Sequence, residues 1–574
     1  MFSVCPKETV SMQTRDGVRL DADVYRPDAD ETFPVLLMRQ PYGRAIASTV
    51  VYAHPIWYAA HGYIVVIQDV RGRGSSEGDF RLFANDIEDG EDTVYWASNL
   101  SGSNGQVGMY GFSYQGMTQL YAAANRPTPL KTICPAMLGY DLYADWAYEG
   151  GALCLQASIG WAMQLAAETA RRDGNVDVYN TLYTAARTSP TCDAVSGYSK
   201  VLNTLAPDSF YHDWLAHPEP DSYWEMLSPR QHIQDVDMPM LHIGGWYDTY
   251  LRGTIRYYRE MAQRSHYPQQ LWIGPWGHIP WGKHVGEMDF GAEASSTIDS
   301  LQIQWFDQFL KGQSTPVVDE SPVHLFEMGS NRWRLLSSWP SPSTTTLFLN
   351  STGLAGINDQ AGTLTDERSP TPTHHKISDI PDTIVHDPWR PVPSKGGHAS
   401  VPSGPMNRAA IDCRSDVLTY TSAPLIDEWQ IAGDISVDLT CTSDAESFDL
   451  CAVLSNVYPD GRVMNITQGY QRILCSTSTH DDIQQDPTSK NSAPVATKSS
   501  LPTYRIQLQP TCISIPRGHA LRLSLSGANF PAHPVNSGHA TPPSATHLLD
   551  ADIITIFIWT GTLHTSKLLI PGRN

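Results

Sequence analysis

The segment Gly-Phe-Ser-Tyr-Gln-Gly at residues 111–116 constrains the fold of this chain more than any other stretch. A short apolar run precedes it, and residues 117–124 follow with the composition of a helix. A serine between glycines at a strand-to-helix turn is the nucleophile-elbow pattern, in which small residues let the strand and the helix approach each other. The usual spacing is G-x-S-x-G, whereas here Gln115 stands in the second glycine position and Gly116 follows it. Because a G-x-S triplet near a glycine is common by chance, a catalytic role for Ser113 requires a base, an acid and an oxyanion site elsewhere.

The chain before this segment alternates strand-like and helix-like stretches. Residues 33–38 and 63–67 have the composition of buried strands, and residues 18–25 alternate apolar and polar side chains as an edge or antiparallel strand does. Residues 86–99 are typical of a helix, with acidic side chains in the first turn, where the helix dipole favours them. The glycine-rich loop at 68–78 lacks the G-x-x-x-x-G-K-[ST] order of a phosphate loop. The alternation predicts an α/β fold with a largely parallel sheet.

The composition changes near residues 144, 240 and 345. The stretch between the first two positions has helical periods and many aromatic residues, and we interpret it as a helical insertion. Strand-like runs then return, followed by a long amphipathic helix at 298–310. After about residue 345 short alternating runs separated by turn residues predict a β-sandwich or jelly roll. Since 574 residues exceed one hydrophobic core, several domains are expected in any case.

Ser113 needs an acid and a base, which in an α/β-hydrolase follow the serine in the order acid, then histidine. Only two strand ends are expected between Ser113 and the β-rich region, and each presents one of these groups after a glycine-containing turn. Asp248 follows the first and His278 the second. His278 would accept the proton of Ser113, while Asp248 would orient the imidazole. Weaker candidates nearby are Asp237, Glu287 and Asp289 for the acid and His242 and His284 for the base.

An acyl-transfer site also needs two donors for the carbonyl oxygen as it becomes negative. The backbone N–H of Tyr114, directly after the serine, is one candidate. The loop after an earlier strand usually supplies the second, and this loop contains Pro41-Tyr42-Gly43 without a His-Gly-Gly motif. The phenol of Tyr42 therefore becomes the candidate donor. The alternative is a surface turn on which Tyr42 only packs.

Charge and cysteine usage exclude several other classes of protein. A formal net charge of −21 disfavours nucleic acids and anionic membranes as partners. The nine cysteines are scattered without C-x-x-C spacing, which predicts reduced thiols in a cytoplasmic protein and neither a disulfide framework nor a zinc site. We see no signal peptide in the first twenty residues and no apolar run long enough for a membrane span. No metal or cofactor is expected.

A set of motifs in a fixed order extends along the whole chain, and together they resemble one family. The motifs are Arg39-x-Pro-Tyr42-Gly, the loop at 68–78, the elbow at 111–116, Gly244-Gly-Trp-Tyr-Asp248, Gly274-Pro-Trp-Gly-His278, the segment at 387–397 and Asp416-Val-Leu-Thr-Tyr-Thr-Ser422. They resemble the cocaine esterase and X-prolyl dipeptidyl aminopeptidase family, which also holds α-amino-acid ester hydrolases and cephalosporin acylases. In this family the second elbow glycine falls at Gly116.

The resemblance implies an α/β-hydrolase core interrupted by a helical cap and followed by a C-terminal jelly roll. The core would comprise residues 1–144 and 240–345, the cap residues 145–239 and the jelly roll residues 346–574. The resemblance further implies a triad of Ser113, Asp248 and His278 with Tyr42 as the oxyanion tyrosine. Members of the family are often dimers, so a homodimer is also allowed.

The cap segments of this chain are similar to those of the cocaine-esterase branch of the family. Two tryptophans that line the acyl pocket there match Trp146 and Trp161, and a pocket aromatic residue matches Tyr250. In that branch a loop of the jelly roll contributes bulky apolar residues to the pocket. This chain has His398 and Val401 in the corresponding segment. The resemblance therefore implies substrate contacts at these five positions, in a more polar or roomier pocket.

These observations predict a serine hydrolase that cleaves an ester, or alternatively an amide, of a small molecule through an acyl-enzyme. Three alternatives remain open. An aminopeptidase or α-amino-acid ester hydrolase would pair a substrate ammonium with carboxylates such as Asp145 and Glu149. An acyltransferase would pass the acyl group to an alcohol or amine. A binding protein would use the jelly roll to recognise carbohydrate and would carry an inert core.

Overall fold

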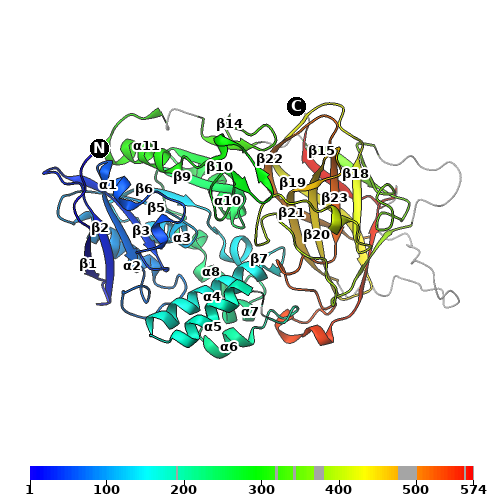
Figure 1. Cartoon of the computed structure of the whole chain (residues 1–574), viewed down its shortest axis with the longest axis horizontal. Coiled ribbons are helices and arrows are strands. Elements are labelled where there is room, and N and C mark those ends of the chain that lie inside the picture. The colour runs from blue at the N-terminus through cyan, green and yellow to red at the C-terminus, as the bar shows by residue number, and fades with distance from the viewer. Residues whose placement is uncertain are drawn as a thin grey trace.

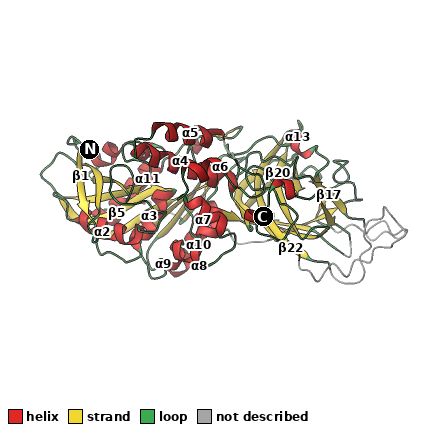
Figure 2. Cartoon of the chain, turned by 90° about the horizontal axis from the view of Figure 1, so that it is seen from below, coloured by secondary structure: helices red, strands yellow, loops and turns green. Residues whose placement is uncertain are grey.

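The computed structural model describes residues 1–188, 190, 192–316, 321–340, 344–367, 380–475, 501–561 and 564–572. Figure 1 shows a core built around one sheet at the N-terminal end and a β domain at the opposite end. The helices between strands β6 (Leu130–Ala136) and β9 (Met240–Tyr247), here called the cap, lie along one side of the core and reach the β domain. Viewed from below, almost all helices gather in the core and the cap, whereas the other end is nearly all strand (Figure 2).

Ten strands form the core sheet in the order β1-β2-β4-β3-β5-β6-β9-β10-β13-β14. The run from β4 to β13 is parallel, while β1, β2 and β14 pair antiparallel at the two edges. The strands are β1 (Glu8–Gln13), β2 (Arg19–Tyr25), β3 (Phe33–Gln40), β4 (Ile64–Asp69), β5 (Ser103–Phe112), β6 (Leu130–Ala136), β9 (Met240–Tyr247), β10 (Gln269–Gly277), β13 (Val323–Glu327) and β14 (Arg332–Leu336). Strands β3, β4 and β9 are buried along their whole length, as expected for parallel strands covered on both faces.

Helices cover both faces of this sheet. On β3 and β5, the side chains of Val35, Leu37 and Met109 pack with α2 and α3, while those of Leu36 and Tyr110 pack with α1 and α11 on the opposite face. The alternation follows from the period of two along a strand. The core helices are α1 (Pro55–Ala60), α2 (Asp86–Ser98), α3 (Tyr114–Ala123), α10 (Leu251–Arg264) and α11 (Ile298–Lys311).

The cap consists of short helices and one two-stranded ribbon. Its longest helix, α4, presents a buried apolar stripe to the rest of the protein. The cap elements are the π-helical turn η2 (Tyr143–Ala147), β7 (Tyr148–Glu149), β8 (Ala152–Leu153), α4 (Leu155–Arg172), α5 (Val176–Thr188), α6 (Lys200–Leu205), α7 (Phe210–Ala216), α8 (Ser222–Leu227) and α9 (Pro229–His232).

The C-terminal part is a largely antiparallel β domain, and β16–β18 is the parallel pair among the strands described there. Its inner face carries a second large apolar cluster. The elements are β15 (Thr344–Asn350), β16 (Thr363–Thr365), β17 (Asp382–His386), α13 (Ala409–Asp412), β18 (Val417–Ser422), β19 (Trp429–Ser443), β20 (Ser447–Val457), β21 (Val463–Leu474), β22 (Thr503–Ile515), β23 (Ala520–Ser526), β24 (Ile554–Trp559) and β25 (Lys567–Pro571). The predicted fold class, an α/β core with a helical insertion and a jelly-roll-type β domain, is thereby confirmed.

One expectation about the strands is wrong. We expected only two strand ends between Ser113 and the β-rich region, but β6, β13 and β14 also lie in this interval and belong to the core sheet. Strand β6 contains Lys131 and Pro135, residues that are rare in a central strand, and β13 is only five residues long. The candidate acid Asp248 and the candidate base His278 nevertheless follow the two strands that were identified, β9 and β10.

The turn between β5 and α3 explains the spacing of its glycines. Ser113 adopts a φ of 61°, which is rare for a residue with a side chain. A Cβ at Gly111 would lie 2.4 Å from the Cβ of Gln115, and one at Gly116 would lie 2.7 Å from the carbonyl oxygen of Ala136. Both positions therefore require glycine, whereas the side chain at position 115 has room.

Gly111→Ala should destabilise the protein because both the backbone angle and the space oppose a side chain. The matched control is Gly105→Ala on the same strand, which has a φ of +84° but nothing within 4 Å of the new Cβ. We expect Gly111→Ala to lower the free energy of unfolding by about 1–3 kcal/mol more than the control does, as overpacking typically costs. Equal losses in chemical denaturation would contradict this account of the turn.

Candidate active site

Three side chains form a continuous hydrogen-bonded chain at one edge of the core sheet. The Nε2 atom of His278 lies 3.0 Å from the Oγ atom of Ser113, and its Nδ1 atom lies 2.7 Å from the Oδ1 atom of Asp248. Asp248 is fully buried, Ser113 is nearly so, and the imidazole of His278 keeps about a quarter of its surface exposed. The arrangement can move the serine proton to the imidazole while the carboxylate fixes the tautomer of the ring.

The sheet topology brings these residues together. Strands β5, β6, β9 and β10 are neighbours and run parallel, so their carboxyl ends lie at the same edge. Ser113 follows β5, Asp248 follows β9, and His278 follows β10. The backbone N–H of Ser113 donates to the carbonyl oxygen of Ala136 at the end of β6, which fixes the start of the turn.

The loop that carries Asp248 is held by the β domain. The side-chain amide of Gln509 on β22 donates to the backbone carbonyl oxygens of Trp246 and Asp248, at 3.0 and 3.1 Å. The hydroxyl of Thr249 donates to the carbonyl oxygen of His398 at 2.7 Å. Sequence reasoning missed Gln509, because one glutamine in an alternating β run carries no signal of a distant contact.

The two candidate oxyanion donors follow neighbouring strands, Tyr42 after β3 and Tyr114 after β5. The Tyr42 phenol accepts a hydrogen bond from the indole Nε1 of Trp161 at 3.0 Å, and burial raises the pKa of Tyr42 to about 12, so the phenol keeps its proton at neutral pH. The backbone N–H groups of Gly116 and Met117 both donate to the carbonyl of Ser113, but within the described part of the chain no backbone acceptor takes the N–H of Tyr114. Both donors are therefore available to a ligand oxygen.

Aromatic rings cover the side of this site that faces the cap. Trp146 on the turn η2 stacks on Tyr250, with ring centroids 4.1 Å apart, and Trp161 lies 5.4 Å from Trp146. The ring of Tyr250 in turn meets His278 edge-on at 5.0 Å. Three of the predicted pocket residues are thus brought to the triad, and together they form an uncharged wall.

The other two predicted pocket residues are placed differently. His398 is 2 % exposed, and its Nε2 lies 3.0 Å from an oxygen of Glu149. The side chain of Val401 is 67 % exposed, and its backbone exchanges hydrogen bonds with the side chain of Gln156 on α4. Neither side chain joins the aromatic wall in this structure.

The weaker acid and base candidates have partners outside the triad. Burial lowers the pKa of His242 to about 4, and its Nε2 lies 3.0 Å from Gln269. Asp289 pairs with His284 at 3.0 Å, and Asp237 pairs with His266 at 2.8 Å. Glu287 accepts from the backbone N–H of Asn407.

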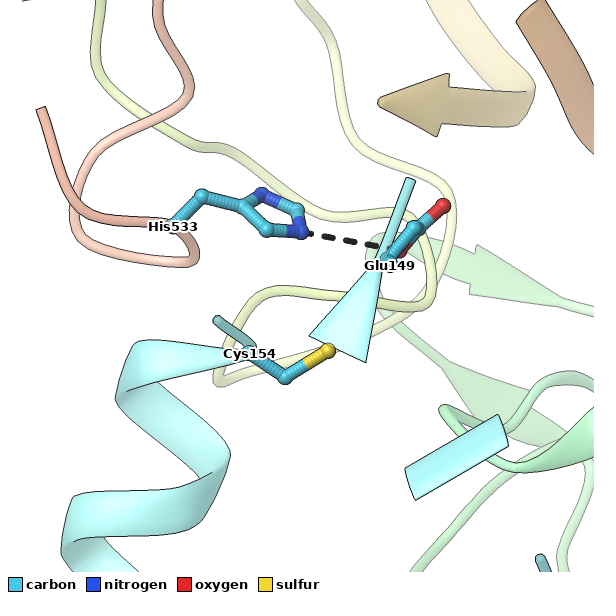
Figure 3. A group of neighbouring side chains, drawn as sticks. All are labelled: Glu149, Cys154 and His533. Atoms are coloured by element: carbon cyan, nitrogen blue, oxygen red, sulfur yellow. Dashed lines mark ion pairs between the residues drawn. The ribbon is translucent and has the colours of Figure 1, made fainter. Parts of the chain in front are cut away.

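A second buried cluster joins the cap to the β domain (Figure 3). It contains Glu149, Cys154 and His533. Each offers one atom that could coordinate a metal, and these atoms lie within 4.8 Å of one another. The guanidinium of Arg252 lies 2.9 Å from Glu149, however, and already supplies the positive charge. Burial would raise the pKa of Glu149, but Arg252 and His398 outweigh it and hold that pKa well below its usual range. Burial also raises the pKa of the Cys154 thiol to about 12. These features fit a buried ion-pair network better than a metal centre, because a cation would be repelled by the arginine.

Other structural findings bear on the expectations from composition. All nine cysteines lie in the described part of the chain and carry free thiols. Among the helices that the structure describes, none has the length and apolar character that a bilayer crossing needs.

A cavity of about 370 Å³ opens between the cap and the β domain, and no triad residue lines it.

Comparison with known proteins agrees with this architecture. Residues 16–280 match the X-Pro dipeptidyl-peptidase family (S15 family), and residues 316–568 match the X-Pro dipeptidyl-peptidase C-terminal non-catalytic domain. The chain is 31 % identical to cocaine esterase of Rhodococcus sp. (strain MB1 Bresler), with 99 % of this chain and 98 % of that protein covered. It is 24 % identical to a putative serine esterase of Mycobacterium bovis, with 97 % of this chain and 94 % of the relative covered.

Solved structures show the same fold over the full length. An aminopeptidase from the marine sediment archaeon Thaumarchaeota archaeon superposes with a TM-score of 0.78 at 20 % identity, over 99 % of this chain and 96 % of that one. An α-amino acid ester hydrolase superposes with a TM-score of 0.77 at 21 % identity, over 100 % of this chain and 97 % of that one. From the matched segments and the full-length similarity to cocaine esterase, this chain belongs to the X-Pro dipeptidyl-peptidase (S15) family of serine hydrolases, in the group that includes cocaine esterase.

Proposed function

We propose that this protein is a serine carboxylesterase that cleaves small-molecule esters with an uncharged acyl group. The observation that carries the proposal is the hydrogen-bonded chain from Ser113 through His278 to Asp248. The similarity to cocaine esterase and to a putative serine esterase supports an ester as the substrate class. The aromatic wall of Trp146, Trp161 and Tyr250, the three residues described above, supports an acyl group without charge.

The reaction follows from the positions of these groups. Ser113 attacks the ester carbonyl while His278 takes its proton, and Asp248 stabilises the imidazolium that forms. The carbonyl oxygen becomes negative and receives hydrogen bonds from the Tyr42 phenol and the Tyr114 N–H. His278 then returns the proton to the departing alcohol. Water, deprotonated by His278, attacks the acyl-enzyme and releases the carboxylic acid and Ser113.

The charges in the cap disfavour the aminopeptidase and amino-acid ester hydrolase alternative. A substrate ammonium would need a free carboxylate, but Glu149 already pairs with Arg252 and His398. Asp145 is fully buried, accepts the backbone N–H of Asp141, and lies 3.3 Å from the guanidinium of Arg256. Both cap acids are therefore engaged. Burying an unpaired ammonium against the aromatic wall would be costly.

Ser113→Ala should abolish esterase activity, because no other group supplies the nucleophile. We expect kcat on a nitrophenyl ester to fall at least ~10⁴-fold and covalent labelling by a fluorophosphonate to disappear. Ser103→Ala on the same strand is the control and should keep both activity and labelling. The proposal fails if Ser113→Ala retains most of its activity or is still labelled.

Replacing a methyl group of the acyl chain by an ammonium should reduce turnover. We expect kcat/KM for the nitrophenyl ester of isobutyric acid to exceed that for the alanine ester by ~10-fold or more at pH 6.5, where the α-amino group is charged. N-acetylation of the alanine ester removes the charge and should recover part of the loss. A clear preference for the free aminoacyl ester would instead favour the amino-acid ester hydrolase alternative.

A further inference from the structure

The hydrogen bond between Trp161 and Tyr42 fixes the direction of the phenol proton. An indole N–H can only donate, so at 3.0 Å the phenol oxygen must be the acceptor. Its own proton is then left for a different partner. Burial raises the pKa of Tyr42, while the Trp161 indole and the Ser113 hydroxyl lower it, so both groups lie near the phenol.

This bond crosses from one part of the fold to another. Tyr42 lies in the turn after β3 of the core, whereas Trp161 lies in the second turn of the cap helix α4. The indole does more than line a pocket, because its polar edge faces the group expected to bind the oxyanion.

The helix α4 is fastened on both sides of Trp161. Towards its C-terminus, the guanidinium of Arg73 donates to the carbonyl oxygen of Leu165 at 2.9 Å and lies near the Thr169 hydroxyl at 3.1 Å. At its N-terminal end, the Gln156 side chain accepts the backbone N–H of Val401 at 3.0 Å. The core loop and the β domain therefore hold the helix from opposite ends.

The indole is also held laterally by its neighbours. Its ring lies 5.0 Å from Phe210, 6.2 Å from Trp214 and 5.4 Å from Trp146. Because neighbouring rings already restrict this side chain, forming the hydrogen bond from its N–H costs little further side-chain entropy.

We propose that Trp161 is a positioning residue for the oxyanion site, acting through Tyr42. By occupying a lone pair of the phenol oxygen, the indole N–H turns the O–H of Tyr42 towards the substrate carbonyl and strengthens it as a donor, since hydrogen bonds in a chain polarise one another. The cap thereby completes the oxyanion site. This inference rests on the proposed esterase function and on Tyr42 as an oxyanion donor.

The test is a double-mutant cycle on a nitrophenyl ester. We expect Tyr42→Phe to lower kcat by ~10²–10³-fold, as loss of an oxyanion donor does. Trp161→Phe keeps the O–H of Tyr42 but removes the hydrogen bond that orients it. This variant should lower kcat about tenfold and change KM less than about twofold. In the Tyr42→Phe background, the same Trp161→Phe change should cost less than about twofold.

Two further variants separate the N–H group from the bulk of the ring. Incorporating benzothienylalanine at position 161 replaces the indole N–H by sulfur and keeps the ring volume, so it should reproduce most of the loss in kcat even if Trp161→Phe folds poorly. Trp224→Phe makes the same substitution on a cap ring that packs on Trp214, and it should change kcat less than about twofold.

The outcomes distinguish this inference from the proposed function. If Trp161→Phe lowers kcat by the same factor in the wild type and in Tyr42→Phe, or mainly raises KM, then Trp161 only lines the pocket. The inference is then wrong, while the esterase function stands. If Tyr42→Phe leaves kcat unchanged, the oxyanion role of Tyr42 is wrong and the inference falls with it. Loss of activity in Ser113→Ala still tests the esterase function independently.

Discussion

The hydrogen bond between the buried Asp248 and the partly exposed His278 is the interaction on which the rest of the site depends. Asp248 is fully buried, and among the described residues its second carboxylate oxygen, Oδ2, has no hydrogen-bond partner. A buried acceptor in this condition costs about 1–3 kcal/mol, more when it is charged. The loop that carries Asp248 must therefore be held by other contacts, and the β domain supplies them through the Gln509 amide and through the His398 carbonyl, which accepts from Thr249.

Three parts of the chain share the construction of one site. The core supplies Ser113, Asp248, His278 and Tyr42, the residues of the proposed site. The cap supplies the indole bonded to Tyr42, and the β domain supplies the amide that holds the loop of Asp248. The β domain matches a domain described as non-catalytic, and in this chain it lies in direct contact with the loop after β9. Such contacts explain physically why a β domain accompanies the catalytic core: it preorganises a loop that the core alone would leave unsupported.

The parts of the fold that sequence alone predicts are those with a local signature. The elbow glycines, the buried strands β3 and β9, and the helix α11 with Gly312 beyond its end each carry their signal within a few residues. Asp248 and His278 could be located because each directly follows a buried strand, although the glycines expected in a turn lie within the ends of those strands. Strand β6 was missed because Lys131 and Pro135 interrupt its apolar pattern.

Contacts between distant residues leave no such signature. Gln509 lies 261 positions from Asp248, and its role depends on how the β domain docks. The burial of His398 accompanies its contact with Glu149, 249 positions away, which local sequence does not signal. The bond between Trp161 and Tyr42 likewise requires the packing of the cap on the core, which composition and periodicity do not encode.

The most direct test of this account is a crystal structure of the protein with a phosphonate or boronate bound covalently at the nucleophile. The account predicts an adduct on Ser113 with one oxygen about 3 Å from both the Tyr42 phenol oxygen and the Tyr114 nitrogen. It also predicts that the acyl-like group lies against Trp146 and Tyr250. An adduct on another residue, or an oxygen on Ser113 that points away from both donors, would contradict the account.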